Sequence, residues 1–594
     1  MTTRAILGLV IFNVFVLAVG AGALWGTRGW RWWTDFVRLA GLAYLLGLSA
    51  LMILTTFELV VGIPIGFLTI LLTGAGLIVL GVIVGRRRGF TAPGLRPPGW
   101  RVPGMSLFSA LFVAGIVVYF EGLFRAQRLA GVGREWDSWA NWLPKARELY
   151  VTGRLEPEFL LLVTSQSPGY PPGPATIQAA AFHAMGSADT VTLHLQYWFL
   201  AIGFVLAVVG LLAKKVHGAI LFPLLLAFLV APTVLDWIVT VYADLPLAYL
   251  VAVAALVLIL WVEEGKAWQL AAATVLLSAG MLTKREGIAF GACVLLAGFV
   301  ASFADRRRLW RPLVAAGLIA FALALPWRIW FTAHGLPGDG PELGYVGAFS
   351  HLDVVWPALK LNVDTLLDAD LWRYVPVLAA AAIVLAGLAG VWRLSLYAGV
   401  FVLAAVGTGT WVFWTNPVAF NDEWPIHRYT GITVLVLAVL APLLLARAWS
   451  AAQDSRAAAE PPGSDLLFRR SRVAWLVVLV GVGSHFGAML VGYSGSGLPG
   501  GLPSSQGVSS CVAAPVADAR VRVVVGYADS YPEAMALREQ AHAAGLVDAQ
   551  ASQDGCGRVR VFVDDLPSLA TSQALVAAAQ AAGLRPTVER DPDD

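Results

Sequence analysis

Charged side chains are scarce in this chain of 594 residues. Only 13% of its residues are Asp, Glu, Lys or Arg, whereas an ordinary soluble chain carries about 25%. Cysteine is also rare, and three residues are too few for a disulfide framework. The sequence contains no phosphate-cradling glycine loop, no serine-nucleophile elbow and no His, Cys and Asp cluster with zinc-site spacing. These features exclude an ordinary soluble protein and an ATP-driven mechanism.

Hydrophobic residues make up 58% of the chain and gather in long runs. Many runs reach the roughly 20 residues that cross a bilayer, and only helices and closed barrels satisfy the backbone in lipid. We therefore predict an all-α polytopic membrane protein with about 13–14 transmembrane helices. The expected spans are 5–25, 39–57, 62–84, 105–124, 190–212, 218–235, 245–262, 268–283, 287–303, 312–331, 373–391, 395–414, 429–447 and 473–493. The short apolar segment 173–187 is a half-helix, a re-entrant piece or a true span.

Arginine and lysine predict the orientation of these spans, because cytoplasmic connections are enriched in both residues. Basic clusters follow the third and fifth spans and precede the tenth and the last, at Arg86–Arg88, Lys214–Lys215, Arg306–Arg308 and Arg469–Arg472. These connections are expected in the cytoplasm. The segments 125–172, 332–372 and 415–428, together with Asp244 and the C-terminal tail, are then expected outside, and so is the N-terminus.

The composition changes after residue 494. Residues 494–510 form a Gly/Ser/Pro-rich linker, which predicts a flexible tether. Residues 511–594 are expected to form a small extracytoplasmic domain. Strands are predicted at 520–525, 547–552, 558–563 and 585–590, with helices at 531–544 and 567–582. This βαββαβ order predicts a ferredoxin-like α+β domain.

A carboxylate set among three tryptophans marks the first external segment. It reads Glu135-Trp-Asp-Ser-Trp-Ala-Asn-Trp142, and tryptophan prefers the headgroup level of a membrane. Helical spacing would place Asp137, Asn141 and Lys145 on one face. Such a face could hold a phosphate and a hydroxyl, or it could be the solvated side of an amphipathic interfacial helix.

Two further elements place polar groups on the same side. Tyr170 lies in the proline-rich stretch Ser167–Pro174, which predicts a rigid entry into the next segment or simply a helix start. Asp244 begins a hydrophobic span after Tyr242-Ala243. An acid between apolar spans often marks a functional site, although Asp244 could also cap the helix, and Asp236 is a nearby alternative.

Cationic groups complete the set on the predicted external side. Lys284-Arg285-Glu286-Gly287 separates two apolar runs, and either cation could bind a lipid phosphate or pair with Glu286 in a tight turn. Arg428 follows His427 before the thirteenth span. A histidine in this position is more often a surface group than a ligand.

In this order, these elements resemble the GT-C superfamily of membrane glycosyltransferases. The resemblance is greatest to the bacterial branch that includes protein mannosyltransferases and RgtA/B/C/D-like lipopolysaccharide sugar transferases. It covers about residues 105–450 and rests on Asp137, Tyr170-Pro171-Pro172, Asp244 and Lys284-Arg285-Glu286-Gly287. Residues 105–493 would then be the catalytic module, preceded by additional transmembrane helices in 1–104. Glu135 and Asp137 both remain candidates for the catalytic base.

The resemblance implies transfer of a sugar from a polyprenyl-phosphate donor to an extracytoplasmic glycan or protein of the cell envelope. It places the enzyme in the bacterial cytoplasmic membrane. Asp137 would be the general base, and Asp244 would orient the acceptor or, with Asp137, hold a divalent Mg or Mn ion. The substrate-binding residues would be Asn141, Lys145, Tyr170, Lys284, Arg285, Glu286 and Arg428.

The C-terminal domain resembles a SPOR-type peptidoglycan-binding module. The resemblance rests on Val523–Tyr527, Glu533–Gly545, Arg558–Val561 and the closing Ala-Ala-Gly-Leu of 581–584. An accessory domain without a ligand is the alternative. Cys511 and Cys556 could form a disulfide there.

Two other functions are compatible with the pattern. A transporter or lipid flippase would show repeated halves and polar groups at the midplane, whereas the polar motifs here gather at one surface. A non-catalytic scaffold that tethers the membrane to the cell wall would not depend on Asp137.

Overall fold

The computed structural model describes ten stretches of the chain. They are residues 2–94, 107–129, 137–163, 168–336, 345–416, 426–459, 521–528, 531–553, 559–566 and 569–590. The predicted span 473–493, the linker, Glu135, Cys511 and Cys556 lie outside these stretches.

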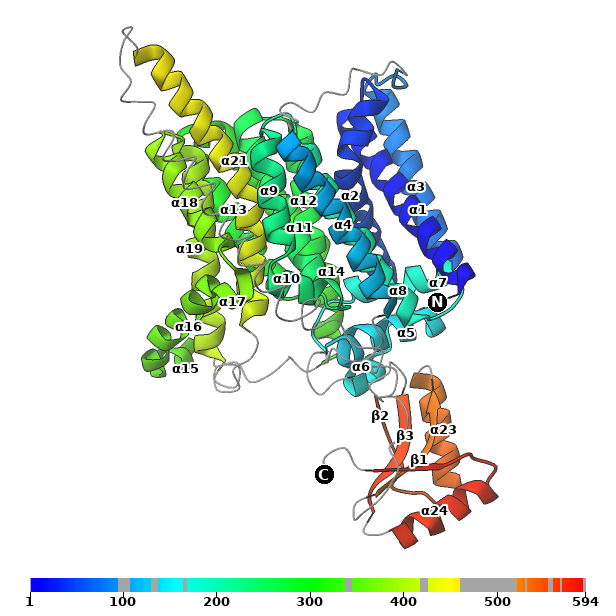
Figure 1. Cartoon of the computed structure of the whole chain (residues 1–594). Helices are drawn as coiled ribbons and strands as arrows, with labels where there is room; N and C mark the ends of the chain where they lie inside the picture. The colour runs from blue at the N-terminus through cyan, green and yellow to red at the C-terminus, as the bar shows by residue number, and fades with distance from the viewer. Residues whose placement is uncertain are drawn as a thin grey trace.

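Long apolar helices dominate the described residues, as predicted (Figure 1). Nine are long and apolar enough to cross a membrane: α1 (Thr3–Arg28), α2 (Trp33–Val60), α3 (Phe67–Arg87), α4 (Leu107–Leu129), α8 (Thr190–Leu212), α11 (Asp244–Glu264), α14 (Arg306–Ala333), α19 (Trp392–Thr415) and α21 (His427–Ala459). The protein is therefore a multi-pass helical membrane protein.

Four of the other predicted spans have shorter or bent helices. α12 (Ala267–Thr283) and α13 (Glu286–Ala301) are apolar but short. The predicted span 218–235 is a bent pair, in which α9 (Gly218–Leu229) meets α10 (Pro232–Ile238) at 68°. α18 (Val375–Leu388) follows the helical segment Leu352–Trp372 at a bend of 115°.

Short helices cover one end of the bundle. They are the π-helix Ser138–Trp142, α5 (Leu143–Thr152), α6 (Pro157–Val163), α7 (Gly173–Met185), α15 (Tyr345–Ser350), α16 (Val355–Leu367) and α17 (Ala369–Trp372). The apolar segment 173–187, which could have been a half-helix, a re-entrant piece or a true span, forms α7. This helix begins in contact with Leu282 of α12 and ends in contact with Gly8 of α1. Leu282 is near the end of α12 and Gly8 is near the start of α1, and Figure 1 shows α7 beside the N-terminus at one end of the bundle. α7 therefore lies along this end and does not cross.

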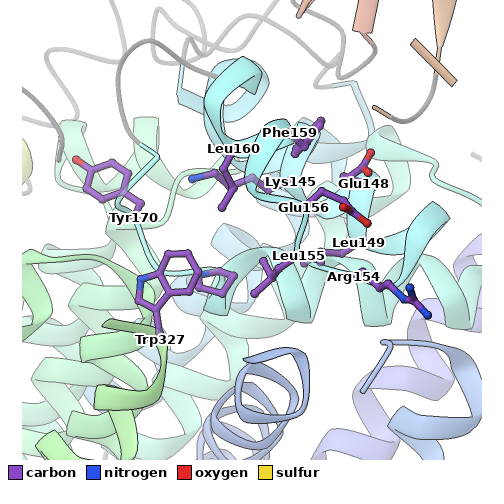
Figure 2. A pocket seen from close by; sticks show the side chains of 11 residues that line it. Lys145, Glu148, Leu149, Arg154, Leu155, Glu156, Phe159, Leu160, Tyr170 and Trp327 are labelled. Carbon is purple, nitrogen blue, oxygen red and sulfur yellow. The ribbon is translucent and has the colours of Figure 1, made fainter. Parts of the chain in front are cut away.

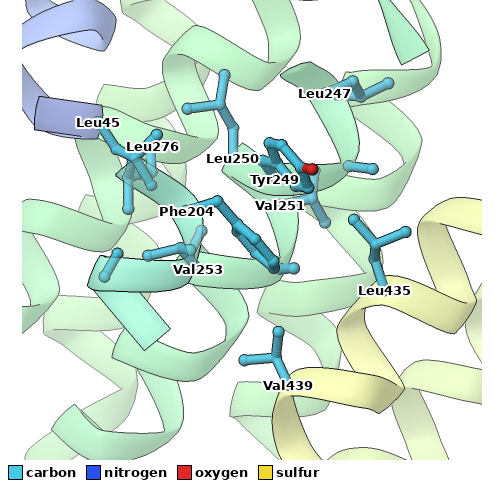
Figure 3. Packing of buried hydrophobic residues seen from close by; sticks show 14 of the residues in the cluster. Leu45, Phe204, Leu247, Tyr249, Leu250, Val251, Val253, Leu276, Leu435 and Val439 are labelled. Carbon is cyan, nitrogen blue, oxygen red and sulfur yellow. The ribbon is translucent and has the colours of Figure 1, made fainter. Parts of the chain in front are cut away.

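α11 is the central helix of the bundle. Every residue from Asp244 to Val262 is buried, which is typical of a helix that is apolar on all sides. Tyr249 stacks on Phe204 of α8 with ring centroids 4.1 Å apart, and Leu435 and Val439 of α21 lie across from it (Figure 3). α11 thereby holds Asp244 in a fixed place at the end that carries the short helices.

Glycines allow neighbouring helices to approach closely at two places. A Cβ atom on Gly47 of α2 would lie 1.9 Å from the carbonyl oxygen of Val16 in α1. A Cβ atom on Gly287 of α13 would lie 2.0 Å from the carbonyl oxygen of Gly280 in α12. Small residues at helix crossings are the usual means of close packing in membranes. The second contact makes the turn through Lys284 tight.

The C-terminal residues form a separate α+β domain with the predicted βαββαβ order. Its elements are β1 (Val521–Ala528), α23 (Tyr531–Ala543), β2 (Gln550–Gln553), β3 (Val559–Leu566), α24 (Leu569–Ala581) and β4 (Thr587–Arg590). The sheet has the order β2-β3-β1-β4 with antiparallel pairs, and Val524 pairs with Phe562. This is the arrangement of a split βαβ unit. Phe159 of α6 packs into the same hydrophobic cluster as Val523 and Val561.

Candidate active site

Four segments that are distant in the sequence meet at the covered end of the bundle. They are the π-helix Ser138–Trp142 with the preceding Asp137, the start of α11, the α12–α13 turn and the start of α21. Each segment contributes a charged side chain that is largely buried. A buried charge is costly unless it is paired, so the pairing of these groups determines the structure of the site.

Arg428 joins the two predicted acids. Its Nη2 donates to Oδ2 of Asp137 and to Oδ2 of Asp244, and its Nε donates to Asp244 at 3.1 Å. The Asp137 and Asp244 side chains are only 4% and 2% exposed, and that of Arg428 is 16% exposed. The two carboxylates therefore share one guanidinium in a place with little access to water.

Lys284 extends this network to the α12–α13 turn. Its Nζ lies 2.9 Å from Oδ1 of Asp244 and 3.5 Å from Oε1 of Glu286. Burial lowers the pKa of Lys284, but the carboxylates of Asp244 and Glu286 raise it by more, so the net shift is upward. Lys284 is thus held as a cation between two acids.

A π-helix shapes the segment after Asp137. The turn Ser138–Trp142 has the wider π geometry, which often occurs at functional sites. Asn141 donates from Nδ2 to Oδ1 of Asp137 at 2.6 Å, and Ser138 Oγ accepts from the backbone N–H of Val241 at 3.2 Å. The first bond holds one oxygen of the Asp137 carboxylate, and the second joins the segment to the approach to α11.

Tyr170 lies inside the same cluster. Its ring stacks on Trp142, with centroids 5.6 Å apart and planes 14° apart. Lys284 Nζ and the Arg285 guanidinium lie 5.1 and 5.5 Å from the Tyr170 ring centre, which is cation–π distance. Burial raises the pKa of the Tyr170 phenol, and Glu286 and Asp137 raise it further. Tyr170 is therefore a neutral phenol at physiological pH.

Lys145 lines a notch next to this network. It lies 5.7 Å from the Trp142 ring centre, and it lines the notch with Glu148, Tyr170 and Trp327 (Figure 2). The notch has room for about one water molecule, so it marks a boundary of the site without being a substrate chamber. Helical spacing places Asp137, Asn141 and Lys145 on one face. In the structure Asn141 is hydrogen-bonded to Asp137, and Lys145 lines the notch.

Several contacts could not be read from the sequence. The sequence places Tyr242 only as a neighbour of Asp244, whereas in the structure the Arg428 guanidinium lies 4.8 Å from its ring centre. The sequence predicts an interfacial position for Trp142, whereas in the structure it is fully buried against Tyr170. Asp236, the alternative acid, is exposed on α10. The predicted substrate-binding residues Asn141, Tyr170, Lys284, Arg285, Glu286 and Arg428 all lie in or beside this network. Glu135 lies outside the described stretches.

The described residues do not fit a divalent metal between Asp137 and Asp244. The Arg428 guanidinium already lies between the two carboxylates and pairs with both. The part of the chain that the structure describes holds no group of three His, Cys, Asp or Glu side chains placed to bind a metal ion.

The chain was compared with protein-family models, with curated proteins and with solved structures, and none of them matches it.

Proposed function

We propose that this chain is an integral membrane glycosyltransferase of the GT-C type. It would move a sugar from a polyprenyl-phosphate donor to a hydroxyl of an extracytoplasmic cell-envelope acceptor. The observation that carries the proposal is the meeting of Asp137 and Asp244 on Arg428 at one end of the helical bundle. This end would face the outside of a bacterial cytoplasmic membrane, because the basic connections that the structure describes lie at the opposite end. They follow α3 and α8 and begin α14 (Figure 1).

Asp137 is the general base in this proposal. Asn141 and Arg428 hold its two oxygens, so the carboxylate keeps one orientation toward an incoming hydroxyl. The acceptor oxygen would lose its proton to Asp137 as it bonds to the anomeric carbon. The bond between that carbon and the phosphate oxygen would break, and the electron pair would leave with the polyprenyl phosphate. Asp244, held by Arg428 and Lys284, would orient the acceptor.

Arg285 is the cation that we assign to the leaving phosphate. It is half-buried beside Tyr170, whereas Lys284 is buried and engaged by Asp244 and Glu286. A guanidinium can bind a phosphate through two parallel hydrogen bonds. Lys284 would act by holding Asp244, and Arg285 would stabilise charge as it develops on the phosphate.

The position of the network favours an enzyme over the transporter alternative. Transporters bind their cargo near the bilayer midplane, at broken helices. Here the paired charges lie where α11 and α21 begin, and the middle of α11 is apolar and buried. A network at one end suits a substrate that is carried in the membrane and reacts at its surface.

Sugar transfer by the purified full-length chain tests the proposal. Defined polyprenyl-phosphate donors carrying hexoses or pentoses would be incubated with the wild type, with Asp137→Asn and with Asp236→Asn as the matched control. Loss of general-base catalysis should lower turnover by about 100-fold or more in Asp137→Asn only. Equal turnover in the wild type and Asp137→Asn would refute the mechanism. Both variants should unfold at the wild-type temperature, so that a loss of turnover reports the chemistry and not the folding.

A further inference from the structure

A polar cavity lies at the opposite end of the bundle from the candidate active site. It has a volume of about 290 Å³ and is lined by residues at the ends of α1, α2, α8, α11 and α12. Five cationic residues line it: Arg28, Arg38, Lys214, Lys215 and Lys266. Only two acids, Asp35 and Glu264, face them. The lining therefore carries an excess of three positive charges.

The acids do not neutralise this cavity. Glu264 pairs with both Lys215 and Lys266, so its charge is divided between two cations. Asp35 lies 3.9 Å from Arg28 and 3.8 Å from Arg38, at the outer limit of an ion pair. Lys214 is exposed at the rim. An anion in the cavity would find cations that the protein itself only partly pairs.

Two buried polar atoms point to a missing ligand or solvent contact. Arg38 donates from Nη1 to the carbonyl oxygen of Gly210 at 3.0 Å, but its Nε is buried and has no partner among the described residues. Gln269 donates from Nε2 to Glu264 at 3.0 Å, whereas its Oε1 is buried without a described partner. Unpaired buried polar groups are costly, so their presence favours a site that is completed by something bound.

The surroundings match an amphiphile. Trp268 lies at the cavity with the Arg28 guanidinium 5.6 Å from its ring centre, and tryptophan prefers the headgroup level. An adjoining groove of about 600 Å³ shares Glu264 with the cavity and runs between α11, α12 and α14. Its lining is mostly apolar and includes Leu270 and Ile319. A basic cavity that adjoins an apolar groove suits a charged head with hydrocarbon chains.

We propose that this cavity binds the phosphate headgroup of an anionic membrane lipid, with an acyl chain of that lipid in the adjoining groove. Basic pockets between transmembrane helices bind anionic lipid headgroups in this way. The site is distinct from the candidate active site, because Asp244 and Glu264 lie at opposite ends of α11. The 21 residues of this helix rise by about 30 Å. The proposal therefore stands whether or not the chain is a glycosyltransferase.

Lipid titration of the delipidated full-length chain in detergent tests this proposal. Dioleoyl-phosphatidylglycerol and dioleoyl-phosphatidylcholine would be compared with inorganic phosphate and pyrophosphate, by native mass spectrometry and by the midpoint of thermal unfolding. The test variant is Arg38→Gln/Lys214→Gln. The control is Arg86→Gln/Arg87→Gln, which removes two exposed charges at the same end but outside the cavity.

Phosphatidylglycerol should bind the wild type and the control equally, and should bind the test variant about 30-fold more weakly. The single exposed substitution Lys214→Glu should weaken binding in the same direction if the double variant does not fold. If the control variant bound phosphatidylglycerol as weakly as the test variant, binding would reflect a general attraction between the lipid and basic surface residues. That result would overturn the proposal. Binding of phosphate or pyrophosphate as tight as that of phosphatidylglycerol would also overturn it, because the site would then belong to a soluble anion.

Discussion

Arg428 donates two hydrogen bonds to one carboxylate oxygen of Asp244, although the two residues are 184 positions apart in the chain. The same guanidinium also pairs with Asp137. The start of α21 is thereby fastened to the start of α11 and to the segment before α5. Arg428 is consequently the group on which the buried charges of the site depend most.

Replacing Arg428 should destabilise the protein as well as inactivate it. Arg428→Met would leave Asp137 and Asp244 as buried acids without their shared cation, a change that typically costs about 3–5 kcal/mol. We expect a clearly lower midpoint of thermal unfolding in detergent. The double variant Arg428→Met/Asp244→Asn should recover part of the loss, because one uncompensated charge is removed. An unchanged midpoint in the single variant would contradict this account of the network.

The stability of the protein should fall at alkaline pH through Lys284. Burial lowers the pKa of Lys284, but the carboxylates of Asp244 and Glu286 raise it by more. The pKa of Lys284 in the folded protein therefore lies above its ordinary value of 10.5. A raised pKa in the folded state means that the stabilisation is complete below pH 10.5 and is lost as the pH rises through the folded value.

Unfolding midpoints recorded between pH 7 and pH 12 check this expectation. Lys284→Met should lower the midpoint near neutral pH and reduce the alkaline decline. The control Lys360→Met removes a lysine whose pair with Asp364 is exposed, and it should leave the profile as it is. A Lys284→Met profile that parallels the wild type throughout would rule out this linkage.

The turn that carries Lys284 should not tolerate a side chain at position 287. In Gly287→Ala, the new Cβ atom would lie 2.0 Å from the carbonyl oxygen of Gly280, so α12 and α13 would have to separate. Such overpacking typically costs about 1–3 kcal/mol. The loss should appear in the unfolding midpoint and in sugar transfer. Gly407→Ala is the matched control, because a Cβ atom there meets nothing within 4 Å. Equal stability of the two variants would contradict the close packing.

The C-terminal domain should affect localisation and not catalysis. If residues 511–594 form a SPOR-type peptidoglycan-binding domain, their deletion should leave sugar transfer intact and lower retention on isolated cell-wall sacculi. The main structural cost of the deletion is at Phe159 of α6. This side chain packs on the C-terminal domain and would become exposed. A truncated chain with undiminished retention would count against a peptidoglycan-binding role.

The hydrophobic runs were sufficient to predict most of the helices. All thirteen expected spans within the described residues correspond to helices or bent helix pairs, because a stretch of about 20 apolar residues has few alternatives in lipid. The bend of 68° between α9 and α10 was not predicted, since the apolar run continues through it. The alternating and helical patterns also predicted the βαββαβ order of elements in the C-terminal domain.

The site could be predicted in part. Asp137, Asp244, Lys284 and Arg428 stood out because charges beside apolar spans are rare. Their pairing could not be predicted, because the partners come from four segments whose proximity depends on tertiary packing. The π-helix was also missed, since local propensity does not distinguish it from an α-helix. Tyr242 and Trp142 carried only a general interfacial signal.

The wide turn at Ser138–Trp142 has a consequence for insertions and deletions. A π-turn accommodates one more residue than an α-turn, so a segment one residue shorter here could wind as an ordinary α-helix. This tightening would absorb the missing residue, and Asp137 would keep nearly the same direction relative to α5. A residue removed from within α5 itself has no such allowance and would rotate everything before it by about 100° around the helix axis. Single-residue changes in length should therefore be tolerated better inside this turn than inside α5.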